Sequence, residues 1–123
     1  MTVHTLFVCK SCSAVLDHEA ADDRAEGNQL FLKLQEAQQA NSDYSNVNIK
    51  AVGCLWTCDR PCSVTFACPQ KYTYHFVDLP AENSAADLLQ FSQLYQESEN
   101  GYILPAKLPE ALRSRLLVRI PPV

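Results

Sequence analysis

The stretch "VNIKAVGCLWTCDRPCSVTFA", residues 47–67, places a cysteine-rich loop between two segments with the character of strands. Apolar and polar side chains alternate through residues 47–52, which is the period of a half-buried strand. Residues 62–67 predict the next strand. The segment that joins the two strands spaces three of the chain's six cysteines four residues apart, at Cys54, Cys58 and Cys62. Such spacing is uncommon for inert core cysteines, so this loop is a candidate functional site.

Upstream of this stretch, the sequence predicts one strand and one helix. The apolar run "HTLFVC", residues 4–9, predicts a first strand that leads directly into "CKSC". Residues from about 20 to 40 predict a helix. Because Gly27 disfavours helix, the helix is expected to start nearer Asn28. The apolar face of this helix consists of Leu30, Phe31, Leu34 and Ala37.

Residues 83–101 predict a second helix, followed by a short tail. Ser84 and Asp87 have the spacing of a capping box at the start of this helix, and Gly101 is a stop signal. In the tail, the segment 109–117 between prolines predicts one further short helix.

Residues 62–67 and 71–79 predict two strands joined by a short turn, hence an antiparallel hairpin. The order is then strand, helix, strand, followed by strand, strand, helix. This order predicts an α/β fold with a mixed sheet covered by helices, the thioredoxin-like arrangement. We expect residues 1–100 to form this domain and residues 101–123 to form a C-terminal extension packed on it.

The composition bounds the class of protein. A chain of 123 residues with 47% hydrophobic residues suits one soluble globular domain, and it has no apolar run long enough to span a membrane. The N-terminus lacks the pattern of a secretory signal, so we expect a cytoplasmic protein whose thiols stay reduced and bind metal or act in redox chemistry. The formal net charge of −4 argues against nucleic acid as a partner.

The two cysteine clusters are expected to converge. A right-handed crossover makes the first two strands parallel, so their carboxyl ends lie at the same end of the sheet. Cys9 and Cys12 follow the first of these strands, and Cys54 and Cys58 follow the second. Four thiolates gathered there would suit tetrahedral zinc or an iron–sulfur cluster. The C-x2-C and C-x3-C spacings do not separate zinc from iron.

A resemblance covers nearly the whole chain. Strand, helix and then "GCLWTC" leading into a hairpin resembles the thioredoxin-like [2Fe-2S] ferredoxins, including the related subunit of respiratory NADH dehydrogenases. The segments "VCKSC", "CLWTCDRPCSV", "YQESENG" and "RIPPV" are similar to an uncharacterised bacterial family of predicted metal-binding proteins related to those ferredoxins.

The resemblance implies a [2Fe-2S] cluster with Cys9, Cys54 and Cys58 as ligands and Cys12 as the fourth. The chain departs from the ferredoxin pattern in two ways: the gap between its first two cysteines is shorter, and Cys62 stands where the ferredoxins tend to have proline. Cys62 is therefore an alternative ligand. The function implied is electron transfer with a redox partner protein rather than catalysis, and a homodimer is the implied assembly.

Two alternatives use the same residues. A zinc-binding module or metal chaperone would use the cysteines without electron transfer. A thioredoxin-like thiol-disulfide oxidoreductase would use Cys9 and Cys12 alone, but it has no need of the three cysteines in the later loop. Acidic residues also follow Cys12, and nearby acids disfavour a thiolate.

The histidines are not paired at metal-ligand spacing. Of the three, His18 is the one expected to approach the cysteines, since His4 and His75 lie within predicted strands. Cys68, in the hairpin turn, is expected to be structural. The sequence contains no phosphate-binding glycine loop and no nucleophile elbow, so hydrolysis is not indicated.

Overall fold

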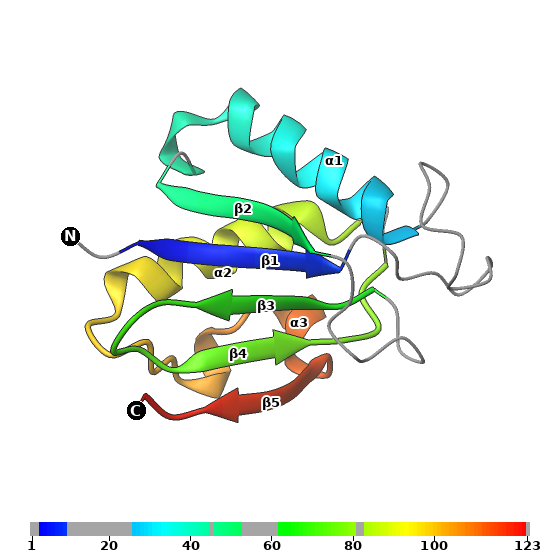
Figure 1. Cartoon of the computed structure of the whole chain (residues 1–123). Helices are drawn as coiled ribbons and strands as arrows, with labels where there is room; N and C mark the ends of the chain where they lie inside the picture. The colour runs from blue at the N-terminus through cyan, green and yellow to red at the C-terminus, as the bar shows by residue number, and fades with distance from the viewer. Residues whose placement is uncertain (1–2, 10–25, 45, 53–61, 81–82, 123) are drawn as a thin grey trace.

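The computed structural model describes residues 3–9, 26–44, 46–52, 62–80 and 83–122 (Figure 1). Within these ranges the chain forms a sheet of five strands in the order β2-β1-β3-β4-β5. The strands are β1 (His4–Cys9), β2 (Val47–Val52), β3 (Val64–Ala67), β4 (Thr73–Phe76) and β5 (Leu116–Ile120). The helices are α1 (Glu26–Ala40), α2 (Ala85–Glu97) and α3 (Glu110–Arg113), with short 3-10 helices η1 (Ser42–Tyr44) and η2 (Pro105–Lys107).

The sheet is mixed, as predicted. β1 pairs in parallel with β2, and the other neighbouring strands pair antiparallel. The parallel crossover through α1 and the β3–β4 hairpin are both confirmed. None of the helices in the described ranges is long and apolar enough to cross a membrane.

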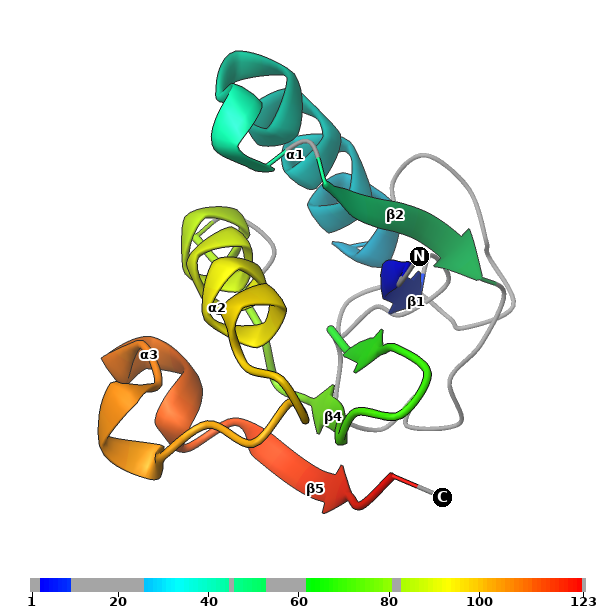
Figure 2. The ribbon, with the colours of Figure 1, turned by 90° about the vertical axis from the view of Figure 1, so that its left-hand side faces the viewer.

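The sheet has two distinct faces. In Figure 2, α1, α2 and α3 all lie on one side of it. Side chains alternate along each strand, so the face toward the helices, here called the helix face, receives every second residue. The helix face carries Leu6, Val8, Val64, Phe66, Tyr74 and Phe76, all of them buried. The second face carries the residues between them.

The core lies between the helix face and α1 and α2. Leu30 and Leu34 of α1 are fully buried, as its apolar stripe predicts. Aromatic rings pack beside them: Phe91 of α2 lies 4.7 Å from Phe66 and 5.0 Å from Tyr74 between ring centroids. Because each fully buried large apolar side chain contributes about 1.5–3 kcal/mol, this layer fixes the helices on one face of the sheet.

The predicted capping box at the start of α2 is wrong. Ser84 makes no side-chain bond to the helix, and its hydroxyl instead donates to the carbonyl oxygen of Pro80 at 2.7 Å. At the other end, α2 stops at Glu97, before Gly101. Gly101 has φ +78° and is needed for a close approach to the sheet rather than for the helix end.

The tail also differs from the prediction. Helix α3 is confined to Glu110–Arg113, and from Leu116 the chain forms β5, which pairs antiparallel with β4. The run "LLVRI" is rich in branched apolar residues, which favour strands. It also pairs with the edge of β4 that β3 leaves open, so the chain forms a strand here and the helix does not continue. The tail thus supplies an edge strand of the sheet.

Candidate metal centre at one end of the sheet

The two strands that precede the cysteine-bearing segments end at the same end of the sheet. β1 and β2 are paired in step, and their last residues, Cys9 and Val52, are partners. The segment after Cys9 and the segment after Val52 therefore leave from adjacent strand ends. Cys12, Cys54 and Cys58 lie in these segments, outside the described residues. The convergence predicted from the crossover is supported as far as the strand ends.

Cys9 is fully buried at this end. Its backbone N–H donates to the carbonyl oxygen of Ser63 at 3.1 Å, which continues the pairing of β1 with β3. Because Leu6 and Val8 point into the core, alternation places Cys9 on the second face of the sheet. Its thiol is shielded from water without belonging to the hydrophobic core.

Cys62 is also fully buried, but its surroundings differ. Its backbone exchanges two hydrogen bonds with Leu79, each 3.1 Å long. Its side chain belongs to the hydrophobic core together with Val64 and Phe66, the residues that follow it at intervals of two. Cys62 and Cys9 therefore lie at the same end of the sheet but on opposite faces.

A histidine lies near Cys9 on the second face. Phe7, Thr65 and His75 are successive partners across β1, β3 and β4. The Thr65 hydroxyl and His75 Nδ1 are 2.7 Å apart and hydrogen-bonded. Burial lowers the pKa of His75, and the charge of Cys9 acts on it in the opposite direction. A negative charge on Cys9 would therefore favour the protonated form of His75.

Sequence reasoning missed this histidine and favoured His18, which lies outside the described residues. Alternation along one strand places His75 and Tyr74 on opposite faces of the sheet. It does not say which residues of the neighbouring strands lie on the same face as His75. The register between β1 and β3 supplies that information.

The remaining cysteine lies at the other end of β3. Cys68 is 7% exposed, and burial raises the pKa of its thiol while the charge of Lys71 opposes that effect. Among the described residues, no group of three or more His, Cys, Asp or Glu side chains could hold a metal ion. The described part of the candidate site therefore consists of Cys9, with His75 two strands away on the same face and Cys62 on the opposite face.

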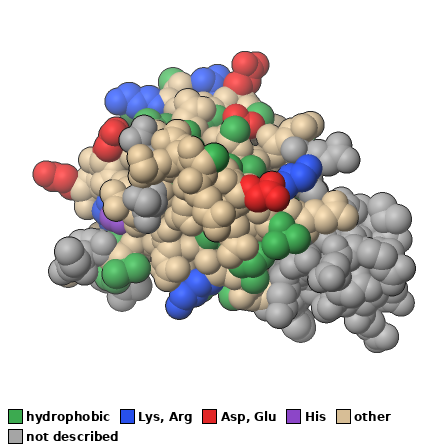
Figure 3. All heavy atoms as spheres, turned by 90° about the horizontal axis from the view of Figure 1, so that it is seen from above, with side chains coloured by type: hydrophobic (Ala, Val, Ile, Leu, Met, Phe, Trp, Pro, Cys, Tyr) green, Lys and Arg blue, Asp and Glu red, His purple; other side chains and the backbone are tan. Residues whose placement is uncertain are grey.

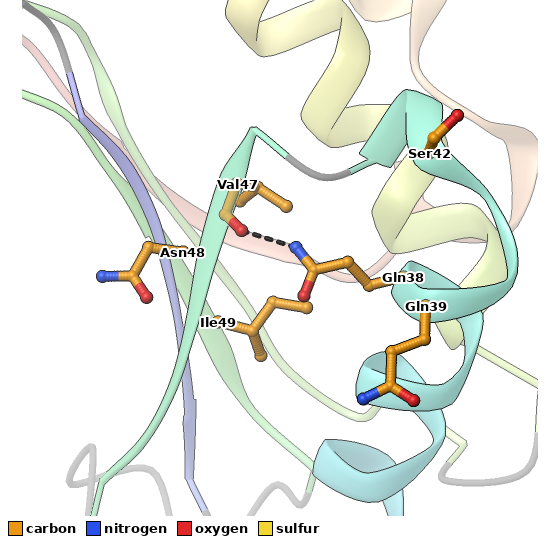
Figure 4. Close-up of a pocket in the computed structure, with 6 residues that line it drawn as sticks. All are labelled: Gln38, Gln39, Ser42, Val47, Asn48 and Ile49. Atoms are coloured by element: carbon orange, nitrogen blue, oxygen red, sulfur yellow. Dashed lines mark hydrogen bonds between the residues drawn. The ribbon is translucent and has the colours of Figure 1, made fainter.

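A large open hollow of about 610 Å³ lies elsewhere, at the start of β2 (Figure 4). Gln38 reaches across it from α1 and donates to the carbonyl oxygens of Val47, at 2.6 Å, and Tyr44, at 2.9 Å. Its lining consists of Gln38, Gln39, Ser42, Val47, Asn48 and Ile49, none of them titratable. Gln38 covers part of the outer edge of β2, so we interpret it as a protector of that edge.

Comparison with solved structures defines the class of fold. The chain is similar to a thioredoxin-like [2Fe-2S] ferredoxin from Aquifex aeolicus, with a TM-score of 0.57 and 10% sequence identity. The match covers 95% of this chain and 92% of that one. The fold is therefore thioredoxin-like, as predicted from the order of elements.

The family is defined by sequence. The chain belongs to the DUF1636 family, described as proteins of unknown function, whose model matches residues 6–122. A comparison with curated proteins found no match.

Proposed function

We propose that this protein holds a [2Fe-2S] cluster through Cys9, Cys12, Cys54 and Cys58 and acts as a ferredoxin-like electron carrier. The observation that carries the proposal is the parallel register of β1 and β2, which ends both strands at the same level. Ligand pairs that follow these two strands start from neighbouring positions. The ferredoxin named above has the same fold, which is consistent with the proposal.

The described part of the site suits such a group. Cys9 is a soft sulfur donor, is not in a disulfide, and is removed from water by burial. When bound, an iron–sulfur cluster supplies one-electron redox chemistry, and its potential depends on solvent exposure and hydrogen bonds to sulfur. Burial of Cys9 would exclude water from one side of the site. Thr65 and His75 would provide a polar neighbourhood within the second face.

We assign the fourth ligand to Cys12 rather than Cys62. Cys62 packs into the core on the helix face, and its backbone is fixed by two hydrogen bonds to Leu79. To reach the face that carries Cys9, it would have to leave the core. Such a move would leave a cavity and break backbone pairing, each of which costs free energy.

The burial of Cys9 also argues against the thiol-disulfide oxidoreductase. The first cysteine of such an enzyme must meet the disulfide of another protein, and reactive cysteines are partly exposed. Cys9 is 0% exposed. Zinc bound by the same cysteines remains the alternative, and measuring the metal content distinguishes it from an iron–sulfur cluster.

We further propose that the protein works in the cytoplasm with a redox partner protein, and that it forms a homodimer. The resemblance to ferredoxins motivates these assignments.

The test is to purify the protein without oxygen, record its visible spectrum, and quantify iron, sulfide and zinc in the same sample. We expect brown protein with about two irons and two sulfides per chain. Colourless protein with about one zinc per chain would replace the electron carrier by a zinc module. Colourless, metal-free protein with a reducible disulfide would favour the oxidoreductase instead.

Substitutions identify the ligands. Cys54→Ser, Cys58→Ser and Cys12→Ser should lose the bound metal, whereas Cys62→Ala should keep it with a modest loss of stability. Cys68→Ser is the matched control at the far end of the sheet and should keep full metal content. If Cys62→Ala loses metal and Cys12→Ser retains it, the fourth ligand is Cys62.

A further inference from the structure

Basic residues are concentrated at the C-terminal end of the chain. Residues 101–123 contain four of its ten Lys and Arg residues and one of its 14 acids, which leaves six basic and thirteen acidic residues in the rest. In Figure 3, seen from the side of α1, charged side chains of both signs are scattered over the described surface. The C-terminal segment, which forms η2, α3 and β5 along the opposite edge of the fold in Figure 2, is predominantly basic.

Two arginines of this segment are held in place by neighbours other than acids. The Arg119 guanidinium lies 4.6 Å from the ring centroid of Tyr102 and 5.3 Å from that of Tyr72. Arg113 donates to the carbonyl oxygens of Leu108, at 3.1 Å, and Ala106, at 2.8 Å. These contacts order the cations without neutralising them, so less side-chain entropy is lost when a carboxylate binds.

A hollow lined by both polar and apolar side chains lies beside these cations. It has a volume of about 360 Å³, and Leu94, Ile103 and Leu104 provide its apolar lining. Leu104 is 52% exposed and Tyr102 is 40% exposed at its edge. The remaining lining residues are Tyr102, Glu97, Ser98 and Lys107.

The hollow and the arginines form one continuous surface. Tyr102 lines the hollow and also stacks against Arg119. Lys107 lines it too, and the adjacent carbonyl of Ala106 is bound by Arg113. We call this surface the C-terminal face; it consists of Tyr102, Leu104, Lys107, Arg113 and Arg119.

We propose that the C-terminal face binds an acidic segment of another protein. An apolar side chain of that segment would enter the hollow, and its carboxylates would meet Lys107, Arg113 and Arg119. Charge complementarity is the reason for this choice of partner. The cations of the C-terminal face attract an acidic segment, whereas the rest of a chain of net charge −4 repels it, so binding should be confined to this face. The proposal does not depend on whether the cysteines hold a metal.

The same surface fits nucleic acid less well. Affinity for nucleic acid comes from many phosphate contacts, and this face offers three cations, of which the contacts above order Arg113 and Arg119. The face also lies beside the C-terminal end of α2, away from the strand ends that carry Cys9 and Cys62. A partner bound there would leave the cysteine end accessible.

The test uses the full chain and a dye-labelled synthetic peptide, EELEEFEE, with KKLKKFKK as the peptide of opposite charge. Binding is followed by fluorescence anisotropy in 50 mM and 200 mM salt, and amide chemical shifts locate it. We expect the acidic peptide to bind more tightly at the lower salt concentration and to shift the amides of Tyr102, Leu104 and Lys107. Arg119→Glu, Lys107→Glu and Leu104→Asp should each weaken binding at least tenfold. Lys33→Glu, on α1, is the matched control and should change it less than twofold.

Four results would overturn the proposal. One is no detectable binding of the acidic peptide, and another is equal weakening by Lys33→Glu and Lys107→Glu. A third is tighter binding of a single-stranded oligonucleotide that the same variants abolish, which would make the face a nucleic-acid site. The last is a dimer in sedimentation that Arg119→Glu dissociates, which would make it an interface between copies of this chain. Thermal unfolding of each variant checks that the fold is retained.

Discussion

The two ends of the sheet bury polar side chains in different ways. At the end where β1 finishes, the described residues contribute the buried thiols of Cys9 and Cys62. At the other end, Lys71 is 8% exposed and its ammonium group donates to the carbonyl oxygens of Tyr95, at 2.9 Å, and Gln96, at 3.3 Å. It also shares a hydrogen bond of 2.8 Å with His4 Nε2.

Lys71 completes the end of α2. The last carbonyls of a helix have no partner within it, and α2 has no basic residue of its own in its last turn. Lys71, from the β3–β4 turn, supplies the missing donors and a positive charge at the negative end of the helix dipole. The cost of burying this ammonium is offset by three acceptors.

The lysine end can be explained by internal bonds alone. The segment "YQESENG", residues 95–101, is explained by internal bonds: the Tyr95 hydroxyl donates to the carbonyl oxygen of Tyr72, and Tyr74 donates to that of Gly101 at 2.7 Å. Cys12, Cys54 and Cys58 lie outside the described residues, and of the described cysteines at this end only Cys62 packs into the hydrophobic core. We therefore expect changes at the lysine end to alter stability and changes at the proposed ligands Cys9, Cys12, Cys54 and Cys58 to alter metal content.

The largest effect on stability is expected for Gly101→Ala. A Cβ atom there would lie 2.8 Å from the Tyr72 nitrogen and 2.9 Å from Lys71 Cβ, and φ is +78°. Strain and overpacking together should lower the free energy of unfolding by about 2–4 kcal/mol. Urea denaturation measures it.

The exposed Ser114→Ala is the control for this substitution and should change stability by less than about 0.5 kcal/mol. Metal content per folded molecule should stay unchanged in Gly101→Ala. A loss of metal in a folded Gly101→Ala protein would break the distinction between the two ends.

Lys71→Met tests the cap on α2 and should have the next largest effect. Methionine fills similar space but leaves the carbonyls of Tyr95 and Gln96 without their donor, which should cost about 1–3 kcal/mol of stability. Hydrogen exchange should accelerate first in the last turn of α2. Lys50→Met, exposed on β2, is the matched control and should leave stability within about 0.5 kcal/mol. Equal stabilities for the two variants would show that the buried ammonium contributes nothing.

Much of this architecture could be predicted from local sequence patterns. The bounds of β1 and β2 agree with the predicted runs at residues 4–9 and 47–52, because an apolar run and a clear alternation mark them. β5 was not predicted, because its residues become a strand only when β4 offers an edge. The cap predicted at Ser84 was wrong because its hydroxyl donates to the carbonyl oxygen of Pro80 instead.

The candidate site divides along the same line. The parallel pairing of β1 and β2, which ends both strands at the same level, could be predicted from the crossover between them. Two features could not be predicted without the register between β1, β3 and β4. They are the placement of Cys9 and Cys62 on opposite faces of the sheet and the placement of His75 on the face of Cys9. Register depends on pairing between distant segments, and a single sequence does not contain that information locally.

The smallest effect is a pH dependence that originates at the lysine end. His4 Nε2 accepts from Lys71, so the folded protein keeps this ring neutral. Burial lowers the pKa of His4, and the charge of Lys71 lowers it further. In the unfolded chain the pKa of histidine is about 6.5, so acid protonates the unfolded state first. Stability should therefore be full at pH values well above about 6.5 and fall as the pH decreases below it.

Comparison with His4→Gln isolates this contribution, because glutamine offers Lys71 an oxygen acceptor that does not titrate in this range. Burial lowers the pKa of His75 as well, so the variant should keep part of the pH dependence and lose the rest. Unfolding free energies at pH 7.5 and pH 5.0 measure the difference between the two proteins. Identical losses of stability in both would mean that His4 is protonated in the fold at no cost. The acid sensitivity would then originate at the cysteine end, where His75 lies on the same face as Cys9.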